Sequence, residues 1–154
     1  MPTVTRKTNV AASPDLVYDL ISDPARMDEW WPRVLRVEDI AGKPGTERTR
    51  WTSVLGAESG RRLRLDYRCT GATRPVRYDW EHELEATPYA EHLTEQSFSI
   101  RIEPQGEGSE VTLTTVNTLR GSARLAGFTM KKGQKSLIDT ALQALAGAFG
   151  EDGH

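Results

Sequence analysis

The feature that most constrains the fold is a strict alternation of charged and apolar residues in the middle of the chain. From Arg62 to Cys69 every second residue is charged, and the residues between them are apolar. A second alternation of the same kind runs from Val76 to Ala86. A period of two, with one polar and one apolar face, is typical of half-buried antiparallel strands. The two segments therefore predict neighbouring strands of a sheet with one face in solvent and one in the core.

Turn residues divide the rest of the chain into further strands and short helices. Ser13 before Pro14 predicts a helix over Pro14–Ser22, because serine caps a helix and proline suits its first turn. Asp23-Pro24 predicts a second short helix before residue 32 by the same logic. We expect seven strands, at residues 3–11, 34–40, 47–55, 61–71, 76–87, 91–103 and 110–120.

One long helix is expected at the end of the chain, over residues 122–149. Gly127 and Gly133 weaken its first half, because glycine disfavours a helix interior. Its second half carries an apolar stripe of Leu137, Ile138, Ala141, Leu142, Leu145 and Phe149. A sheet with one apolar face and one long helix to cover it should curl around that helix, which gives an α+β fold.

The charges also predict a register for the first hairpin. With a turn at residues 70–75, opposite charges face each other, as in the pair Arg64 and Glu81. Tyr67 then lies opposite Tyr78. The inner face of this hairpin carries Tyr67, Tyr78, Trp80 and His82.

The last hairpin predicts a polar layer inside the fold. Across a turn at residues 104–109, apolar residues face one another near the turn and polar residues at the far end. The opposed pairs are Ile102–Val111, Ile100–Leu113, Phe98–Thr115 and Gln96–Asn117. Across the preceding turn, His82 lies opposite Thr94 or Gln96. His82, Gln96 and Asn117 should therefore form one polar layer on a concave surface that is otherwise apolar and aromatic.

Composition excludes several classes of protein. The 154 residues fit one domain over 1–150 with a frayed tail at 151–154. A net charge of -2 and an isoelectric point near 5.9 argue against a nucleic-acid partner. The single cysteine, Cys69, allows no intramolecular disulfide and no cysteine zinc site. Residues 1–7 lead into no apolar secretory stretch, and no apolar run approaches the ~20 residues of a membrane span. We expect a cytoplasmic protein without integral membrane association, and a homodimer is compatible with this interpretation.

The opening of the chain resembles the START-like (SRPBCC, Bet v 1-like) superfamily through V-A-A-S-P-D-L-V-Y-D-L-I-S-D-P at residues 10–24. The stretch E-W-W-P-R-V at residues 29–34 resembles the one that follows it in the polyketide cyclase/dehydrase group. The resemblance implies a helix-grip fold, with a curved seven-stranded sheet around the C-terminal helix and a large internal cavity. Members are similar in binding apolar small molecules; some cyclise or aromatise polyketides, some carry lipids or quinones, and some assist chaperones. The motifs are structural and assign no catalytic residue.

His82 is the candidate for proton transfer, because histidine exchanges a proton near neutral pH, and Tyr78 is a second candidate. The alternative for His82 is a core histidine held by one hydrogen bond. A metal site at His82 and His92 lacks a third ligand, so we expect neither a metal nor a cofactor. His92 is expected to be exposed.

Ligand contacts are expected from three groups of residues, each of which could instead be ordinary core. The walls are Trp51, Tyr67, Tyr78, Trp80 and Phe98. The polar contacts are His82, Gln96, Thr115 and Asn117, and a movable lid would comprise Phe128 and Met130. Trp30 and Trp31 are expected to pack the short helices onto the sheet edge, with one of them at the cavity mouth as the alternative.

Three functions follow from this arrangement. The first is binding of a planar or lipid-like hydrophobic molecule that carries one or two oxygens. The second is a polyketide aromatase/cyclase or dehydratase in the same cavity, where the walls would fold a reactive chain and His82 or a tyrosine would move the proton. The third is a protein-interaction module, acting on a chaperone or another partner, in which the cavity is incidental.

Overall fold

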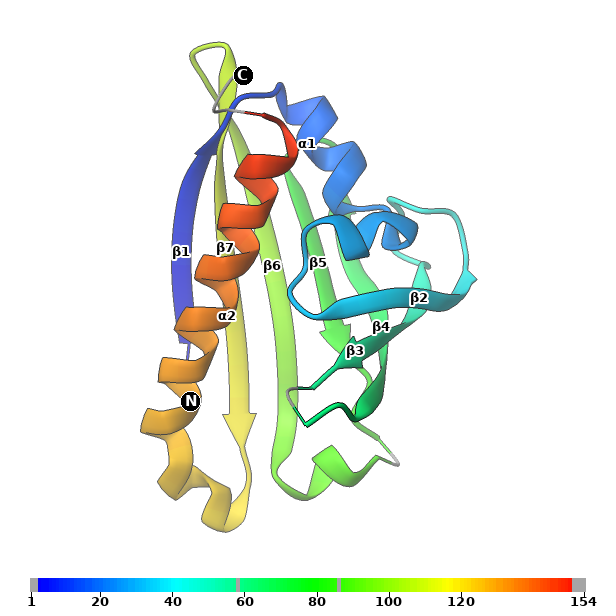
Figure 1. The fold of residues 1–154 in the computed structure, drawn as a ribbon, viewed down its shortest axis with the longest axis vertical. Coiled ribbons are helices and arrows are strands. Elements are labelled where there is room, and N and C mark those ends of the chain that lie inside the picture. Colours follow the sequence, from blue (N-terminus) through cyan, green and yellow to red (C-terminus); the bar gives the residue numbers. More distant parts are fainter. Residues whose placement is uncertain (1–2, 58, 86, 151–154) are drawn as a thin grey trace.

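The computed structural model describes residues 3–57, 59–85 and 87–150. In that part of the chain seven strands form one antiparallel sheet, in the order β1-β7-β6-β5-β4-β3-β2 (Figure 1). The strands are β1 (Thr3–Val10), β2 (Val34–Ala41), β3 (Arg50–Gly56), β4 (Arg62–Thr73), β5 (Arg77–His82), β6 (Leu93–Gln105) and β7 (Gly108–Leu119). The helices are α1 (Pro14–Ile21), η1 (Pro24–Glu29), η2 (Pro88–Glu91), η3 (Gly121–Ala126) and α2 (Gly127–Ala148). The expected α+β fold with seven antiparallel strands is confirmed.

Both short helices begin where the sequence predicts. The Ser13 hydroxyl accepts a hydrogen bond from the Leu16 amide at 3.4 Å, and Pro14 occupies the first turn of α1. The Asp23 carboxylate accepts from the Ala25 amide at 3.1 Å and caps η1. The second segment winds as a 3₁₀ helix of six residues, and it carries the chain from one edge of the sheet toward the other.

The prediction of a strand over residues 76–87 is wrong at its C-terminal end, because β5 ends at His82. The chain turns there instead. Thr87 donates through both its amide (3.0 Å) and its hydroxyl (2.6 Å) to the Leu84 carbonyl, and η2 follows at once. A threonine that closes a turn on its own side chain competes with strand pairing, which explains the early end.

The C-terminal segment is not one continuous helix over 122–149. It begins as the 3₁₀ helix η3, changes to α-helix at Gly127, and then passes through Gly133 without a break. In Figure 1, α2 runs along one face of the sheet beside β1 and β7. It buries the middle of the predicted apolar stripe there, namely Ile138, Ala141, Leu142 and Leu145.

The register predicted for the β4–β5 hairpin is wrong. Tyr67 lies opposite His82 rather than Tyr78, and Glu81 lies opposite Arg68 rather than Arg64. The reason is that β4 continues to Thr73, beyond a bulge at Gly71, before the turn to β5. Between the bulge and His82 the pairing shifts by an even number of residues, so Tyr67, Trp80 and His82 keep their predicted inner face.

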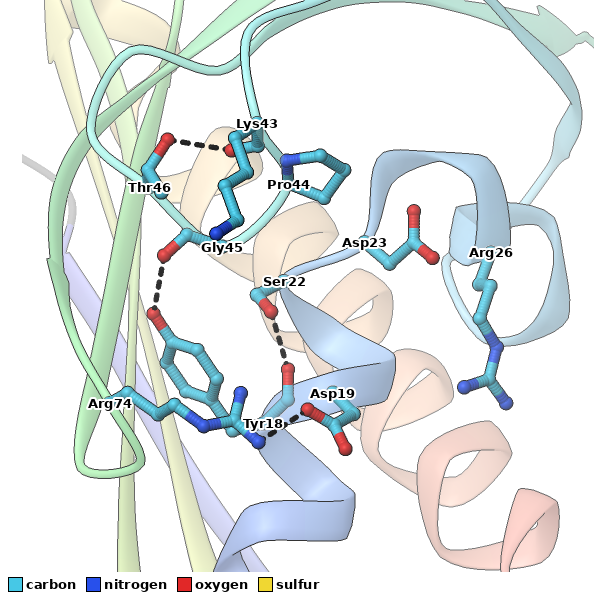
Figure 2. A pocket seen from close by; sticks show the side chains of 10 residues that line it. All are labelled: Tyr18, Asp19, Ser22, Asp23, Arg26, Lys43, Pro44, Gly45, Thr46 and Arg74. Carbon is cyan, nitrogen blue, oxygen red and sulfur yellow. Dashed lines mark hydrogen bonds and ion pairs between the residues drawn. The ribbon is translucent and has the colours of Figure 1, made fainter.

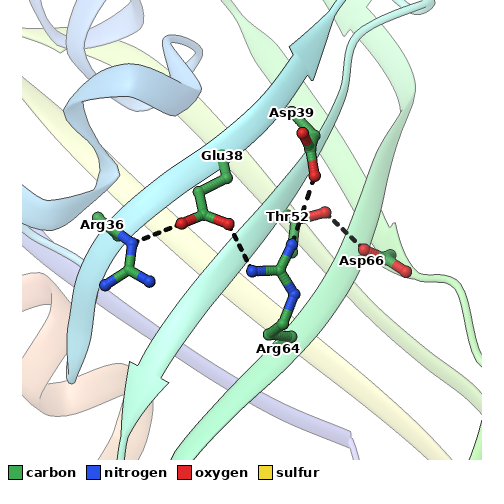
Figure 3. Close-up of polar contacts among 6 residues, drawn as sticks. All are labelled: Arg36, Glu38, Asp39, Thr52, Arg64 and Asp66. Carbon is green, nitrogen blue, oxygen red and sulfur yellow. Dashed lines mark hydrogen bonds and ion pairs between the residues drawn. The ribbon is translucent and has the colours of Figure 1, made fainter.

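Arg64 instead pairs on the outer face with residues of β2. Figure 3 shows its guanidinium beside the carboxylates of Glu38 and Asp39, with Arg36 on the other side of Glu38. The Thr52 hydroxyl donates to Asp66 at 2.6 Å in the neighbouring strands. The ion-pair residues are largely exposed, and such pairs each contribute ~0–1 kcal/mol. This face is consistent with a solvated surface, as the alternation of charges predicts.

The register predicted for the β6–β7 hairpin is confirmed. All four opposed pairs form: Ile102–Val111, Ile100–Leu113, Phe98–Thr115 and Gln96–Asn117. The apolar members at the turn end are buried in the core that the sheet shares with α1 and α2. The polar members lie at the opposite end, where the core changes character.

Candidate ligand-binding site

The concave face of the sheet carries a continuous cluster of aromatic rings. Trp80 and Phe98 stack across β5 and β6 with ring centroids 5.3 Å apart. Trp31 lies edge-on to both, at 5.5 Å from Trp80 and 5.1 Å from Phe98, and Trp30 contacts Trp31 at 5.3 Å. Both tryptophans after η1 are buried at the centre of the cluster, rather than at the sheet edge alone.

The other predicted wall residues join the same cluster. Trp51 stacks on Tyr67 with centroids 6.0 Å apart, and Tyr67 reaches Phe98 at 6.4 Å. Tyr78 lies 5.9 Å from Trp80. All five residues predicted as walls are therefore buried together, and their contact with a ligand stays a prediction.

Three polar atoms in this cluster have no hydrogen-bond partner among the described residues. They are the indole Nε1 of Trp30, the indole Nε1 of Trp51 and the hydroxyl of Tyr78. The thiol next to Tyr78, that of Cys69, donates to the Gly71 carbonyl at 3.4 Å instead. Leaving a buried donor unpaired costs ~1–3 kcal/mol, so these three atoms are where the cluster would gain most from a further hydrogen-bond partner.

The polar layer predicted at the far end of the sheet is present. His82 Nδ1 lies 3.0 Å from Gln96 Oε1, and Gln96 Nε2 donates to Asn117 Oδ1 at 2.9 Å. The partner of His82 is thus Gln96 rather than Thr94. The layer borders the aromatic cluster, because the His82 ring lies 5.2 Å from that of Tyr67.

Thr115 and one residue that the sequence did not single out extend this layer. The amide of Asn117 donates to the Thr115 hydroxyl at 3.3 Å, and that hydroxyl donates to Gln134 Oε1 at 3.3 Å. Gln134 lies on α2, four residues after Met130, whose sulfur accepts from its amide at 3.9 Å. The only sequence signal for Gln134 is its place one helical turn from Met130, a candidate lid residue.

Burial sets the protonation of the candidate acid–base groups. It lowers the pKa of His82, against the opposing effect of its hydrogen bond to Gln96. Burial also raises the pKa of Tyr67 and Tyr78. A neutral imidazole can accept a proton, whereas the two phenols stay protonated and can only donate a hydrogen bond or accept one.

An open cleft of about 320 Å³ lies against this polar layer. Both His82 and Gln96 line it, together with Leu84 and Thr94. Its remaining lining is charged and comprises Arg50, Arg68, Glu81, Glu83, Glu85 and Glu95. His82 therefore lies between the aromatic cluster on one side and a polar opening on the other.

A second cleft, of about 560 Å³, lies at the opposite end of the molecule, between α1 and the loop after β2 (Figure 2). The Tyr18 hydroxyl donates to the Gly45 carbonyl at 3.0 Å, and Arg74 pairs with Asp19 at 2.6 Å. Arg74 also lies over the Tyr18 ring, 5.1 Å from its centroid. None of the residues predicted to bind a ligand lines this cleft, and several of its charges are already paired.

The two candidate lid residues fare differently. Met130 packs against a small second core formed by Leu84, Leu93 and Leu119. The side chain of Phe128 lies outside the described residues, so its predicted contact with a ligand stays a prediction.

His92 is exposed, as expected. In the part of the chain that the structure describes, no group of three histidine, cysteine or acidic residues could hold a metal ion.

A seven-stranded antiparallel sheet curved around a C-terminal helix, with an aromatic interior between them, defines the helix-grip class of START-like proteins. The chain belongs to the polyketide cyclase / dehydrase and lipid transport family, whose family model matches residues 1–150. No curated protein sequence matches the chain. Over the described residues, no helix has both the length and the apolar character needed to cross a membrane.

Solved structures share this fold at low sequence identity. The di-domain ARO/CYC StfQ from the steffimycin biosynthetic pathway superposes with a TM-score of 0.78 and 13% identity over 98% of this chain. The match spans 51% of that protein, about one of its two domains. A START superfamily protein from Mycobacterium smegmatis gives 0.75 and 16% identity over 96% of both chains. A protein from Thermobifida fusca gives 0.70 and 22% identity, covering 100% of this chain and 98% of its own.

Proposed function

We propose that this protein binds a hydrophobic small molecule, planar aromatic or lipid-like, against the aromatic cluster on the concave face of the sheet. The observation that carries the proposal is the set of three unpaired polar atoms on Trp30, Trp51 and Tyr78 inside that cluster. A guest molecule with one or two oxygens that enters between the rings would give these donors partners. The family description, which includes lipid transport, supports this class of ligand.

Intrinsic fluorescence offers a direct test, because the chain has four tryptophans and all four lie in the cluster. We expect a planar aromatic probe such as 2-naphthol, or a lipid-like probe such as oleic acid, to change tryptophan emission saturably. A molecule bound in the cleft of Figure 2 would lie against Tyr18 and no tryptophan. Native mass spectrometry of protein purified gently from its own host would then show whether a natural ligand is present.

A matched pair of variants separates the indole donor from simple packing. Trp51→Phe keeps an aromatic ring beside Tyr67 but removes the unpaired Nε1, whereas Trp51→Leu removes the ring as well. We expect Trp51→Phe to weaken binding of an oxygen-bearing probe about two- to tenfold, the worth of one hydrogen bond. Absence of any saturable emission change with either probe, and a bare polypeptide mass, would contradict the proposal and favour the interaction-module alternative.

The second candidate is a polyketide aromatase/cyclase or dehydratase that acts in the same place. The observation that favours it is a neutral, buried His82 bordering both the aromatic cluster and an open cleft, where a substrate oxygen could reach it. The family description and the StfQ fold are in keeping with this chemistry. His82→Ala should then abolish turnover of a linear polyketide analogue while weakening its binding no more than about tenfold, the worth of one hydrogen bond. Unchanged turnover would remove His82 from the mechanism.

A further inference from the structure

The polar layer is a chain of side-chain hydrogen bonds that all run in one direction. Starting from α2, Gln134 accepts from the Thr115 hydroxyl at 3.3 Å, and Thr115 accepts from the Asn117 amide at 3.3 Å. Asn117 in turn accepts from the Gln96 amide at 2.9 Å. Gln96 then presents its carbonyl oxygen to His82 Nδ1 at 3.0 Å. Four elements, α2, β7, β6 and β5, are linked in this way, without a charged residue between them.

The end of this hydrogen-bond series at α2 sets the direction of the whole series. A thioether sulfur accepts a hydrogen bond and has no proton to donate. Gln134 Nε2 lies 3.9 Å from Met130 Sδ, and in this orientation the Gln134 oxygen faces the Thr115 hydroxyl. In the reverse arrangement the Gln134 oxygen would face the sulfur, acceptor against acceptor. Thr115, Asn117 and Gln96 then each have one orientation in which every donor faces an acceptor.

The consequence reaches the imidazole. Because Gln96 offers an acceptor to Nδ1, that nitrogen must carry the proton, and a neutral imidazole has only one N–H. The lone pair therefore stays on Nε2. Which nitrogen of a histidine is protonated is set by the hydrogen bond that the other one makes.

We propose that Gln134 is a positioning residue that, through Thr115, Asn117 and Gln96, holds His82 with its proton on Nδ1, so that Nε2 accepts a hydrogen bond from a ligand hydroxyl. This inference rests on the proposed function and narrows its ligand class to a hydrophobic molecule bearing an alcohol or phenol group. Burial supports it, because Thr115 and Asn117 are fully buried and water cannot replace their partners freely.

The first test is nitrogen-15 NMR of the histidine side chains in the unliganded protein, which tells a protonated ring nitrogen from one with a lone pair. Wild-type His82 should show the proton on Nδ1. Thr115→Val, which removes the central hydroxyl at nearly constant volume, should lower the ratio of the Nδ1–H to the Nε2–H form about two- to tenfold. Gln134→Leu should do the same from the helix. Thr112→Val, on the outer side of the same strand, should leave the ratio unchanged.

Two results would overturn the positioning role. One is a wild-type His82 that carries its proton on Nε2. The other is a ratio that neither Thr115→Val nor Gln134→Leu changes although both variants remain folded. A purely structural role for the layer would alter stability in these variants without moving the tautomer ratio.

The second test addresses the ligand hydroxyl with two matched probes. 2-Naphthol carries a hydroxyl, and 2-methoxynaphthalene has the same rings without a donor. We expect 2-naphthol to bind about two- to tenfold more tightly, and Gln134→Leu to reduce that difference. Equal affinity for the two probes would overturn the ligand class. Failure of both to bind would overturn the ligand class, and if oleic acid also fails to bind, the proposed function is overturned as well. The tautomer assignment is decided by NMR alone.

Discussion

Trp80 and Phe98 stack across neighbouring strands with their ring planes 20° apart, and Trp31 closes the pair from the side of η1. The stack joins three parts of the chain at the centre of the concave face. The stack therefore stabilises the sheet and also forms part of the candidate site.

We expect Phe98→Ala to reduce the free energy of unfolding by about 3–5 kcal/mol, because it removes a buried ring and leaves a cavity beside Trp80 and Trp31. Urea denaturation followed by circular dichroism would measure the loss. Val76→Ala, at an exposed apolar position, is the control and should change stability little. A loss below ~1 kcal/mol for Phe98→Ala would show that the cluster is loosely packed.

Two buried tyrosines should respond in opposite ways to loss of the hydroxyl. Tyr18→Phe breaks the hydrogen bond to the Gly45 carbonyl and should cost about 0.5–1.5 kcal/mol. Tyr78→Phe removes a hydroxyl whose only polar neighbour among the described residues is the Cys69 thiol, a weak partner, so stability should be unchanged or slightly higher. Thermal denaturation of the two variants side by side measures the contrast. Equal losses would mean that the Tyr78 hydroxyl is hydrogen-bonded after all.

The stability of the protein should depend on pH through His82. Burial lowers its pKa below the ordinary 6.5, so the unfolded chain binds more protons than the folded one between the lowered value and 6.5. The free energy of unfolding should therefore fall as the pH drops through that window. His82→Gln should make the free energy of unfolding less dependent on pH in this window. Urea denaturation at pH values from about 5 to about 7, where histidine titrates, would measure the change. His92→Gln, at an exposed position, should leave that pH dependence unchanged.

Two glycines should also respond oppositely to alanine. Gly133 lies inside α2, and a Cβ there would meet nothing, so Gly133→Ala should add about 0.5–1 kcal/mol of stability. A Cβ on Gly108 would lie 2.3 Å from the Val10 carbonyl oxygen, so Gly108→Ala should destabilise the protein. Comparing melting temperatures of the two variants checks both signs. A destabilising Gly133→Ala would contradict the exposure of this part of α2.

The sequence was a good guide to which face each residue occupies, because alternation survives any even shift of the strands. It failed on the β4–β5 register, since arginines and acids that alternate every two residues look complementary in several registers. The bulge at Gly71 and the long end of β4 then decide between them. The β6–β7 hairpin has only one register in which apolar residues face each other at one end and polar residues at the other. Ile102–Val111 and Gln96–Asn117 are the pairs that fix it.

Contacts between separate elements were the part that sequence reasoning missed. Trp30 and Trp31 were expected at the sheet edge, yet they reach Trp80 at the centre. Gln134 was overlooked because nothing local distinguishes it from a solvated helix residue. Its role depends on how α2 crosses β7, a tertiary relationship that no period in the sequence encodes.

The sheet order places β1 beside β7 at one edge and β2 at the other. Residues far apart in the sequence, such as Thr3 and Val116, must therefore meet before that edge is complete. Until β7 is in place, β1 has no neighbour in the sheet. Such long-range pairing is slow and leaves an open strand edge exposed in the interval. A folding intermediate without the β1–β7 pairing is therefore prone to pair with another molecule through that edge.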